Sequence, residues 1–202
     1  MTFSGGEAGL QAAFVIEAAG QLREAGVHVA FDTSGHLPAD AFDRVSAAVD
    51  LVLFDLKQRD PAKHKALTGV DLGLIDENAA RLGAAGVPTW VRVPVIPGCT
   101  DDEENARAIA RFIRQRLPQM GRKQGGEGRG AGGGRIDLLA YNSLAEADYA
   151  RMGLTYPLAG LALCRRSSLD RFRAVMEAEG LADIHISGRF RPEDDEGGGN
   201  RG

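Results

Sequence analysis

Polar residues follow several apolar runs of this sequence, where a binding protein or an enzyme could use them. Gly5 and Gly6 precede Glu7, so a stretch of backbone without side chains lies beside a carboxylate. Backbone carbonyls next to a carboxylate suit an ammonium group. Asp55 and Lys57 are two residues apart, so in a strand their side chains share one face. A carboxylate and an ammonium group on one rim could hold the two ends of a zwitterion.

Three further positions could complete such a site. Asp32 and Thr33 end an apolar run and could ligate a cation or hydrogen-bond a ligand. Arg92 lies inside an apolar run, where its charge requires a partner. That partner is either an anionic group of a ligand or a neighbouring aspartate. Either Tyr141 or Asn142, at the end of another apolar run, reaches the same rim if the runs are parallel strands.

Each of these groups also has a simpler interpretation. The Gly-Gly-Glu segment alone could be an ordinary turn between a strand and a helix. Asp32 could organise its own loop, as aspartate often does. Asp55 and Lys57 could form a surface ion pair, which contributes about 0–1 kcal/mol. The histidines and the two cysteines form no catalytic pair, disulfide framework or metal-ligand spacing: His28, His36, His64, His185, Cys99 and Cys164.

The surrounding pattern predicts alternating strands and helices. Apolar, β-branched runs predict buried strands, after a short strand at 2–4, over 27–32, 51–55, 89–93 and 136–141. Helical periodicity favours helices over 10–25, 76–85, 100–117 and 169–179. Thr100 is the expected N-cap of the third helix, and the prolines after Arg92 are expected to end that strand near Val93. Such alternation implies right-handed βαβ units and a parallel sheet. Both a twisted open sheet and an open barrel satisfy this pattern.

Composition sets the broad class of protein. The chain has 202 residues, 44% of them hydrophobic and 26% charged, which is enough for one domain with a core. A net charge of −4 argues against a partner that is nucleic acid or an anionic membrane. No apolar run approaches the roughly 20 residues that cross a bilayer, and no signal peptide is evident, so we expect a cytoplasmic protein. We expect a barrel over 1–190, with a flexible glycine-rich insertion at 121–134 and a disordered tail at 191–202.

The ordered series of motifs resembles one family, the glycyl-radical-enzyme activating enzymes of the radical SAM proteins, and within it the activators of pyruvate formate-lyase. The resemblance covers roughly 1–188. It rests on Ser-Gly-Gly-Glu-Ala at 4–8, Asp-Thr-Ser-Gly at 32–35, Leu-Phe-Asp-Leu-Lys at 53–57, Thr-Gly at 68–69, Arg-Val-Pro-Val-Ile-Pro-Gly-Cys-Thr-Asp at 92–101 and Leu-Leu-Ala-Tyr-Asn at 138–142. The fold that it implies is α/β, an open parallel (β/α)6 partial TIM-type barrel.

The resemblance also implies a role for each position in binding S-adenosylmethionine. Gly5, Gly6 and Glu7 match the motif that binds the methionine amino group, and Arg92 matches a position near the cofactor. Asp55, Leu56 and Lys57 match the segment that lines the methionine and ribose parts. Asp32, Thr33 and Asp55 fall on positions that hold a monovalent cation. Asn142 stands where relatives have a histidine near the ribose and adenine.

The implied activity is reductive cleavage of S-adenosylmethionine by a [4Fe–4S] cluster, followed by hydrogen abstraction from a glycine of a partner enzyme. The partner would be pyruvate formate-lyase or a related glycyl radical enzyme, and flavodoxin or ferredoxin would donate the electron. The sequence contains no CxxxCxxC loop, which in the family lies upstream of Gly-Gly-Glu, so the iron–sulfur ligands are absent. We therefore expect an inactive fragment, truncated at its N-terminus and missing the first βα unit.

Two alternatives stay open at this point. The chain could be a SAM-binding or partner-docking module that works without a cluster. It could also be an aldolase-like barrel enzyme with Lys57 as the Schiff-base nucleophile. The second alternative requires a desolvated lysine, and Asp55 opposes a lowered lysine pKa.

Overall fold

The computed structural model describes residues 1–120 and 134–191. Six strands form one all-parallel sheet in which each strand lies beside the next one in the sequence. The strands are β1 (Thr2–Phe3), β2 (Ala30–Thr33), β3 (Leu51–Asp55), β4 (Thr89–Val95), β5 (Arg135–Ala140) and β6 (Ile184–Ser187). The predicted α/β class and the open parallel sheet are therefore confirmed.

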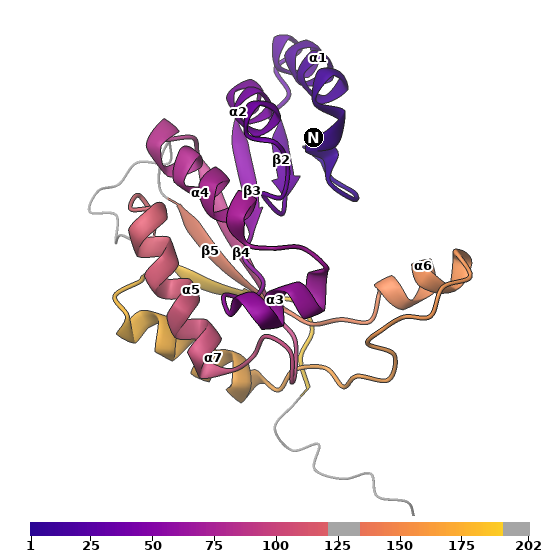
Figure 1. The fold of residues 1–202 in the computed structure, drawn as a ribbon, viewed down its shortest axis with the longest axis vertical. Coiled ribbons are helices and arrows are strands. Elements are labelled where there is room, and N and C mark those ends of the chain that lie inside the picture. The colour runs from indigo at the N-terminus through magenta and orange to yellow at the C-terminus, as the bar shows by residue number, and fades with distance from the viewer. Residues whose placement is uncertain (121–133, 192–202) are drawn as a thin grey trace, which may run out of the picture.

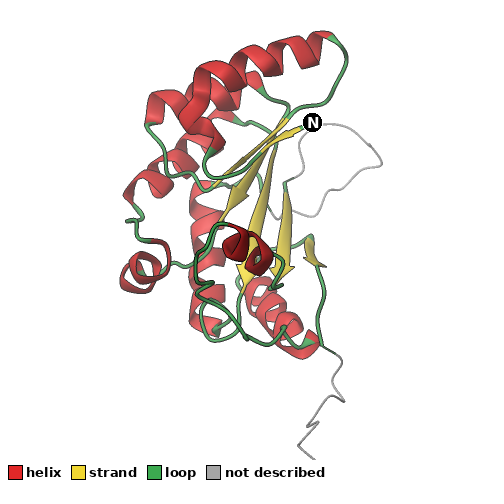
Figure 2. Ribbon diagram, turned by 90° about the vertical axis from the view of Figure 1, so that its right-hand side faces the viewer, coloured by secondary structure: helices red, strands yellow, loops and turns green. Residues whose placement is uncertain are grey.

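The main helices form a single layer along one face of this sheet (Figure 1). In this layer each helix packs against the next, in the order α1, α2, α4, α5 and α7. A second view, turned by 90°, shows the curved sheet beside this layer (Figure 2). Helix α6 projects away from the rest and buries none of its residues. The helical segments are η1 (Ala8–Gln11), α1 (Ala12–Glu24), α2 (Ala39–Ala48), α3 (Pro61–Thr68), α4 (Gly73–Ala85), α5 (Glu103–Arg116), α6 (Ala145–Arg151) and α7 (Arg166–Ala178).

The two faces of the sheet differ in character. Val52 and Phe54 of β3 are fully buried, and the ring of Phe54 meets Phe42 of α2 at 6.3 Å between centroids. The alternate residues of the strands face away from the helices, because successive side chains point to opposite faces. Asp55 and its register partner Arg92 lie on this second face. The polar groups therefore gather opposite the core, where no helix of the main layer covers them.

Strand β4 is longer than predicted. It continues past Pro94 to Val95, although we expected proline to end it near Val93. Arg92 turns its carbonyl toward β3, where the N–H of Leu56 donates to it at 2.9 Å. Pro94 faces the same side two residues later, beyond the end of β3, so its missing N–H costs no ladder hydrogen bond. Its carbonyl accepts from the Thr100 hydroxyl at 2.7 Å.

The predicted start of α5 was wrong. Thr100 is not the N-cap, because its hydroxyl donates to the Pro94 carbonyl and accepts from the N–H of Ile96. Asp102 caps the helix instead, accepting from the N–H of Asn105 at 2.8 Å. Strand β2 begins at Ala30 rather than at 27, because the N–H of Val29 donates to the Asp50 carboxylate. Elements α2, α3, α6 and β6 were not predicted.

The remaining sequence-based expectations lie mostly outside the described residues. The insertion expected at 121–134 and the tail expected at 191–202 lie outside the described residues except for one residue each. Those two residues are ordered by backbone bridges, Gly134 with Met120 and Arg191 with Arg165. Among the helices of the described ranges, none is long and apolar enough to span a membrane.

One close helix contact gives a direct test of this packing. A Cβ on Gly83 of α4 would lie 2.0 Å from the backbone oxygen of Arg116, at the end of α5. We expect Gly83→Ala to lower the free energy of unfolding by about 1–3 kcal/mol, because the two helices must move apart. Urea denaturation measures the change.

Gly20 of α1 is the matched control, since nothing lies within 4 Å of a Cβ built there. Gly20→Ala should raise the free energy of unfolding by about 0.5–1 kcal/mol through helix propensity alone. Equal stabilisation by both substitutions would contradict the close contact between α4 and α5.

Candidate functional site

The candidate site lies at the carboxyl ends of β1 to β4. Parallel strands bring these ends to one edge of the sheet, where α/β folds place their ligands. Glu7 follows β1, Asp32 lies in β2, Asp55 ends β3 and Arg92 lies in β4. The structure brings these four charged side chains together, although they are up to 85 positions apart in the sequence.

Arg92 joins the two aspartates. Its Nε donates to Oδ1 of Asp55 at 2.8 Å, and its Nη2 lies 2.7 Å from the same oxygen. The same Nη2 donates to Oδ1 of Asp32. Asp32 also accepts from the hydroxyl of Ser4 at 2.7 Å. Of the two partners considered for Arg92, the structure therefore shows aspartate, and one guanidinium compensates two carboxylates.

The Arg92, Asp32 and Asp55 side chains are each about four-fifths buried. Burial raises the pKa of Asp55 above its ordinary value, against the opposing attraction of Arg92 and Lys57. The ammonium of Lys57 lies 3.9 Å from Oδ2 of Asp55, and the Lys57 side chain is 39% exposed. The site thus presents a half-exposed ammonium group beside a partly buried, arginine-held carboxylate.

Glu7 is held by the loop that follows β2. Its Oε1 accepts from the Thr33 hydroxyl at 2.8 Å. Its Oε2 accepts from the backbone N–H and the hydroxyl of Ser34, at 3.0 and 2.8 Å. The carboxylate is therefore fixed in orientation before any ligand binds. The Thr33 hydroxyl points to Glu7, on the opposite sheet face from the Asp32 side chain, rather than toward the two aspartates.

Gly5 and Gly6 have φ angles of 94° and 57°, a backbone region that favours glycine. Nothing lies within 4 Å of a Cβ built at either position. Glycine is therefore required here by conformation and not by crowding from the protein. The open space leaves the backbone accessible to a ligand, as the zwitterion hypothesis requires.

The other predicted site residues take different places. Leu56 is buried and extends the β3–β4 ladder through its N–H, so its side chain belongs to the core. Asn142 is exposed beyond β5, and its Oδ1 accepts from the N–H of Leu144 at 3.1 Å. It lies on the same edge of the sheet but contacts none of the charged group.

Ser4 and Ser34 belong to the quoted motifs, yet their hydrogen bonds to Asp32 and Glu7 were not predicted.

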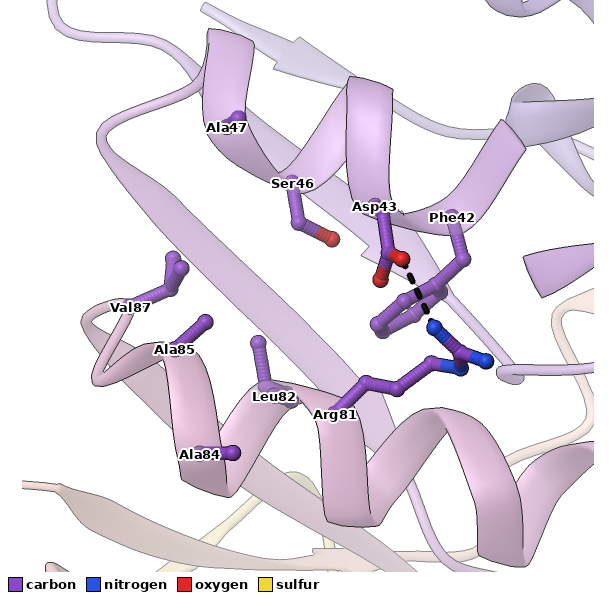
Figure 3. A pocket seen from close by; sticks show the side chains of 9 residues that line it. All are labelled: Phe42, Asp43, Ser46, Ala47, Arg81, Leu82, Ala84, Ala85 and Val87. Atoms are coloured by element: carbon purple, nitrogen blue, oxygen red, sulfur yellow. Dashed lines mark hydrogen bonds and ion pairs between the residues drawn. The ribbon is translucent and has the colours of Figure 1, made fainter. Parts of the chain in front are cut away.

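A cavity of about 250 Å³ opens beside these residues, lined by Glu7, Ser34, His36, Asp55 and Lys57 among others. A larger hollow of about 430 Å³ lies between α2 and α4 (Figure 3). Alanine, leucine and valine side chains line most of it, and the Asp43–Arg81 ion pair stands at one end. That hollow lies in the helix layer, away from the charged group, so the smaller cavity is the chemically relevant one.

The described residues do not fit an iron–sulfur cluster. Such a cluster requires several cysteine thiolates, and the whole sequence has two cysteines. Burial raises the pKa of the Cys164 thiol, which donates to the Val95 carbonyl and so packs as a core residue. No group of three or more histidine, cysteine or acidic residues in the described part of the chain could hold a metal ion.

The Arg92 network gives a test that separates buried from exposed ion pairs. Arg92→Met leaves two partly buried carboxylates without their cation, so we expect a loss of about 2–4 kcal/mol in the free energy of unfolding at pH 7. Without Arg92 the pKa of Asp55 rises further above its unfolded value. The protonated form then stabilises the fold, so the loss should shrink at pH 4 and grow as pH rises.

Arg81→Met is the control, because Arg81 pairs with Asp43 where both side chains are about half exposed. We expect a loss of about 0–1 kcal/mol there, with little change between pH 4 and pH 7. Urea denaturation of both variants at the two pH values measures these losses in the free energy of unfolding. An Arg92 effect as small as the Arg81 effect would contradict the compensating role of Arg92.

Comparison with known proteins supports a common origin for this arrangement. The family model described as the radical SAM superfamily matches residues 1–109. The pyruvate formate-lyase 1-activating enzyme of Escherichia coli K12 is 31% identical over 182 residues, covering 89% of this chain and 68% of that protein. The (2S)-3-sulfopropanediol sulfolyase activating enzyme of Bilophila wadsworthia is 30% identical over 163 residues, covering 80% of this chain and 49% of that protein.

A solved structure extends the similarity to the fold. A domain of the pyruvate-formate lyase-activating enzyme from Bacteroides vulgatus superposes with a TM-score of 0.70 at 25% identity, covering 93% of this chain and 98% of that one. The sheet, the order of the motifs and the sequence identity thus agree. The chain belongs to the radical SAM superfamily, in the group that includes the pyruvate formate-lyase activating enzymes.

Proposed function

We propose that this chain forms the S-adenosylmethionine-binding part of an activating enzyme that generates a glycyl radical on a partner enzyme. The observation that carries the proposal is the charged group at the edge of the sheet. It combines an accessible Gly5–Gly6 backbone, an oriented Glu7 carboxylate and the Asp55–Lys57 pair. These groups complement a ligand that carries an ammonium and a carboxylate on one carbon, as the methionine end of S-adenosylmethionine does.

Each residue would have a distinct part in holding that ligand. The carbonyls of the Gly5–Gly6 backbone and the Glu7 carboxylate would accept from the ammonium group. The Lys57 ammonium, half exposed at the cavity, would attract the ligand carboxylate. Arg92 would keep Asp32 and Asp55 in place while it neutralises them. Asn142 would contribute at the nucleoside end, on the same edge of the sheet.

The monovalent cation expected at Asp32, Thr33 and Asp55 stays part of the proposal. In the structure the positive charge between the two carboxylates comes from Arg92. A bound cation would therefore have to share these oxygens with the guanidinium.

The wider reaction rests on the relatives. We propose pyruvate formate-lyase or a related glycyl radical enzyme as the partner, flavodoxin or ferredoxin as the electron donor, and the cytoplasm as the location. The Bilophila protein supports keeping the partner class broad, because its name gives a different enzyme as the one activated. These 202 residues do not supply the thiolates of a [4Fe–4S] cluster, so we expect the isolated chain to bind S-adenosylmethionine without cleaving it.

The two alternatives fare differently. A module that binds S-adenosylmethionine or a partner without a cluster is compatible with everything described above. The Schiff-base aldolase requires a neutral, desolvated amine. Lys57 lies 3.9 Å from the Asp55 carboxylate and its side chain is 39% exposed, so the structure does not place this amine in the desolvated environment that the chemistry requires. The geometry around Lys57 therefore opposes the aldolase hypothesis.

Calorimetric titration of this chain tests the proposal. S-adenosylmethionine should bind at least about tenfold more tightly than 5′-methylthioadenosine, which has the nucleoside and sulfur but lacks the amino acid end. Lys57→Met should reduce this preference about tenfold, because it removes the cation offered to the ligand carboxylate.

Lys65→Met is the matched control, since Lys65 lies on α3 in an exposed pair with Asp71. We expect it to leave both affinities unchanged. Equal affinity of the wild-type chain for the two ligands, or no saturable binding of either, would overturn the proposal.

A further inference from the structure

The loop after β2 is held from behind by a residue of the helix layer. Asn78 of α4 is completely buried, and its side-chain N–H groups donate to the carbonyls of Gly35 and Leu37 at 2.8 and 2.9 Å. Two carbonyl acceptors determine which side of the carboxamide carries the nitrogen. The side chain therefore closes a specific bridge between helix and loop.

The same loop fixes Glu7. The Gly35 N–H donates to Oγ1 of Thr33 at 2.9 Å, and that hydroxyl donates to Glu7. Ser34, between them, donates twice to the other carboxylate oxygen of Glu7. Hydrogen bonds thus connect Asn78 to Gly35, Gly35 to Thr33 at the end of β2, and Thr33 to the Glu7 carboxylate. Asn78 itself does not line the cavity beside Glu7.

A second buried asparagine, in the next βα unit along the chain, also donates hydrogen bonds to loop carbonyls. Asn105 of α5 is 2% exposed and donates to the carbonyls of Lys57 and Thr100, at 3.1 and 2.9 Å. Its Oδ1 accepts from the N–H of Arg59 at 2.9 Å. Asn105 therefore holds the loops after β3 and β4, whereas the contacts of Asn78 are with the loop after β2.

We propose that Asn78 is the positioning residue for Glu7, acting through the loop at 33–37. The hydrogen bonds of the Glu7 carboxylate go to Thr33 and Ser34 and not to α4, so its orientation depends on the loop. Among the described residues, only Asn78 ties that loop to α4 through side-chain hydrogen bonds. Loss of the two donors would leave the Gly35 and Leu37 carbonyls buried without these partners. The loop would then shift and release Glu7. The consequence for ligand affinity rests on the function proposed above.

Asn78→Asp tests this, because it preserves the shape and replaces two donors with an oxygen that faces two carbonyls. Hydrogen exchange by NMR should show the Ser34 and Gly35 amides exchanging about tenfold faster or more. Asn78→Ala, which removes both donors without adding a charge, should give the same acceleration and covers the case in which the aspartate variant does not fold. Asn105→Asp, the matched control, should leave these two amides unchanged.

S-adenosylmethionine affinity supplies the second readout. Asn78→Asp should weaken binding about tenfold in the wild-type background and cause no further loss when Glu7 is already alanine. Asn105→Asp should weaken binding by the same factor in both backgrounds. Folded Asn78 variants with unchanged exchange at Ser34 and Gly35, or additive losses with Glu7→Ala, would overturn the proposal. The exchange readout needs no ligand, so it decides the role of Asn78 even if the chain proves not to bind S-adenosylmethionine.

Discussion

The ion pair that one arginine makes with two aspartates is the constraint around which the edge of the sheet is arranged. Arg92 reaches Asp55 on the neighbouring strand and Asp32 one strand further away. Partly buried carboxylates are costly without a cation, so this guanidinium permits both to lie on the sheet face opposite the helix layer. As a consequence, the charges of Arg92, Asp32 and Asp55 are already paired with one another. Lys57 can still meet an anionic group, because its contact with Asp55 is long, at 3.9 Å.

The site is assembled from loops that the helix layer holds in place. Glu7 follows β1 but takes its orientation from the loop after β2, and that loop is in turn tied to α4. The loop after β3, which carries Lys57, is tied to α5 in the same manner. Successive βα units therefore support one another across the edge of the sheet. This arrangement explains how short strands, β1 with only two residues among them, can present groups in fixed positions.

Much of this arrangement could be predicted from the sequence, and the failures have physical causes. The apolar run of β3 predicted its bounds correctly, and parallel strands predicted that Asp32, Asp55 and Arg92 would lie at one edge of the sheet. The sequence leaves open whether Arg92 pairs with an aspartate or with a ligand anion, and the structure shows both aspartates as its partners. The predicted end of β4 near Val93 was wrong, because Pro94 loses no ladder hydrogen bond where the neighbouring strand has ended. Asn78 and Asn105 could not be recognised, since a polar residue on an amphipathic helix reads as a surface residue. Their partners are loop carbonyls, which leave no pattern in the side chains.

The central claim is that the Gly5–Glu7 segment and the charged group beside it bind S-adenosylmethionine. An NMR titration of the isotope-labelled chain with S-adenosylmethionine measures this residue by residue. The account predicts the largest chemical-shift changes at the amides of Gly5, Gly6 and Glu7 and in the loops that follow β2 and β3. Saturable changes confined to another surface, such as the hollow between α2 and α4, would contradict it, as would a spectrum that the ligand leaves unchanged.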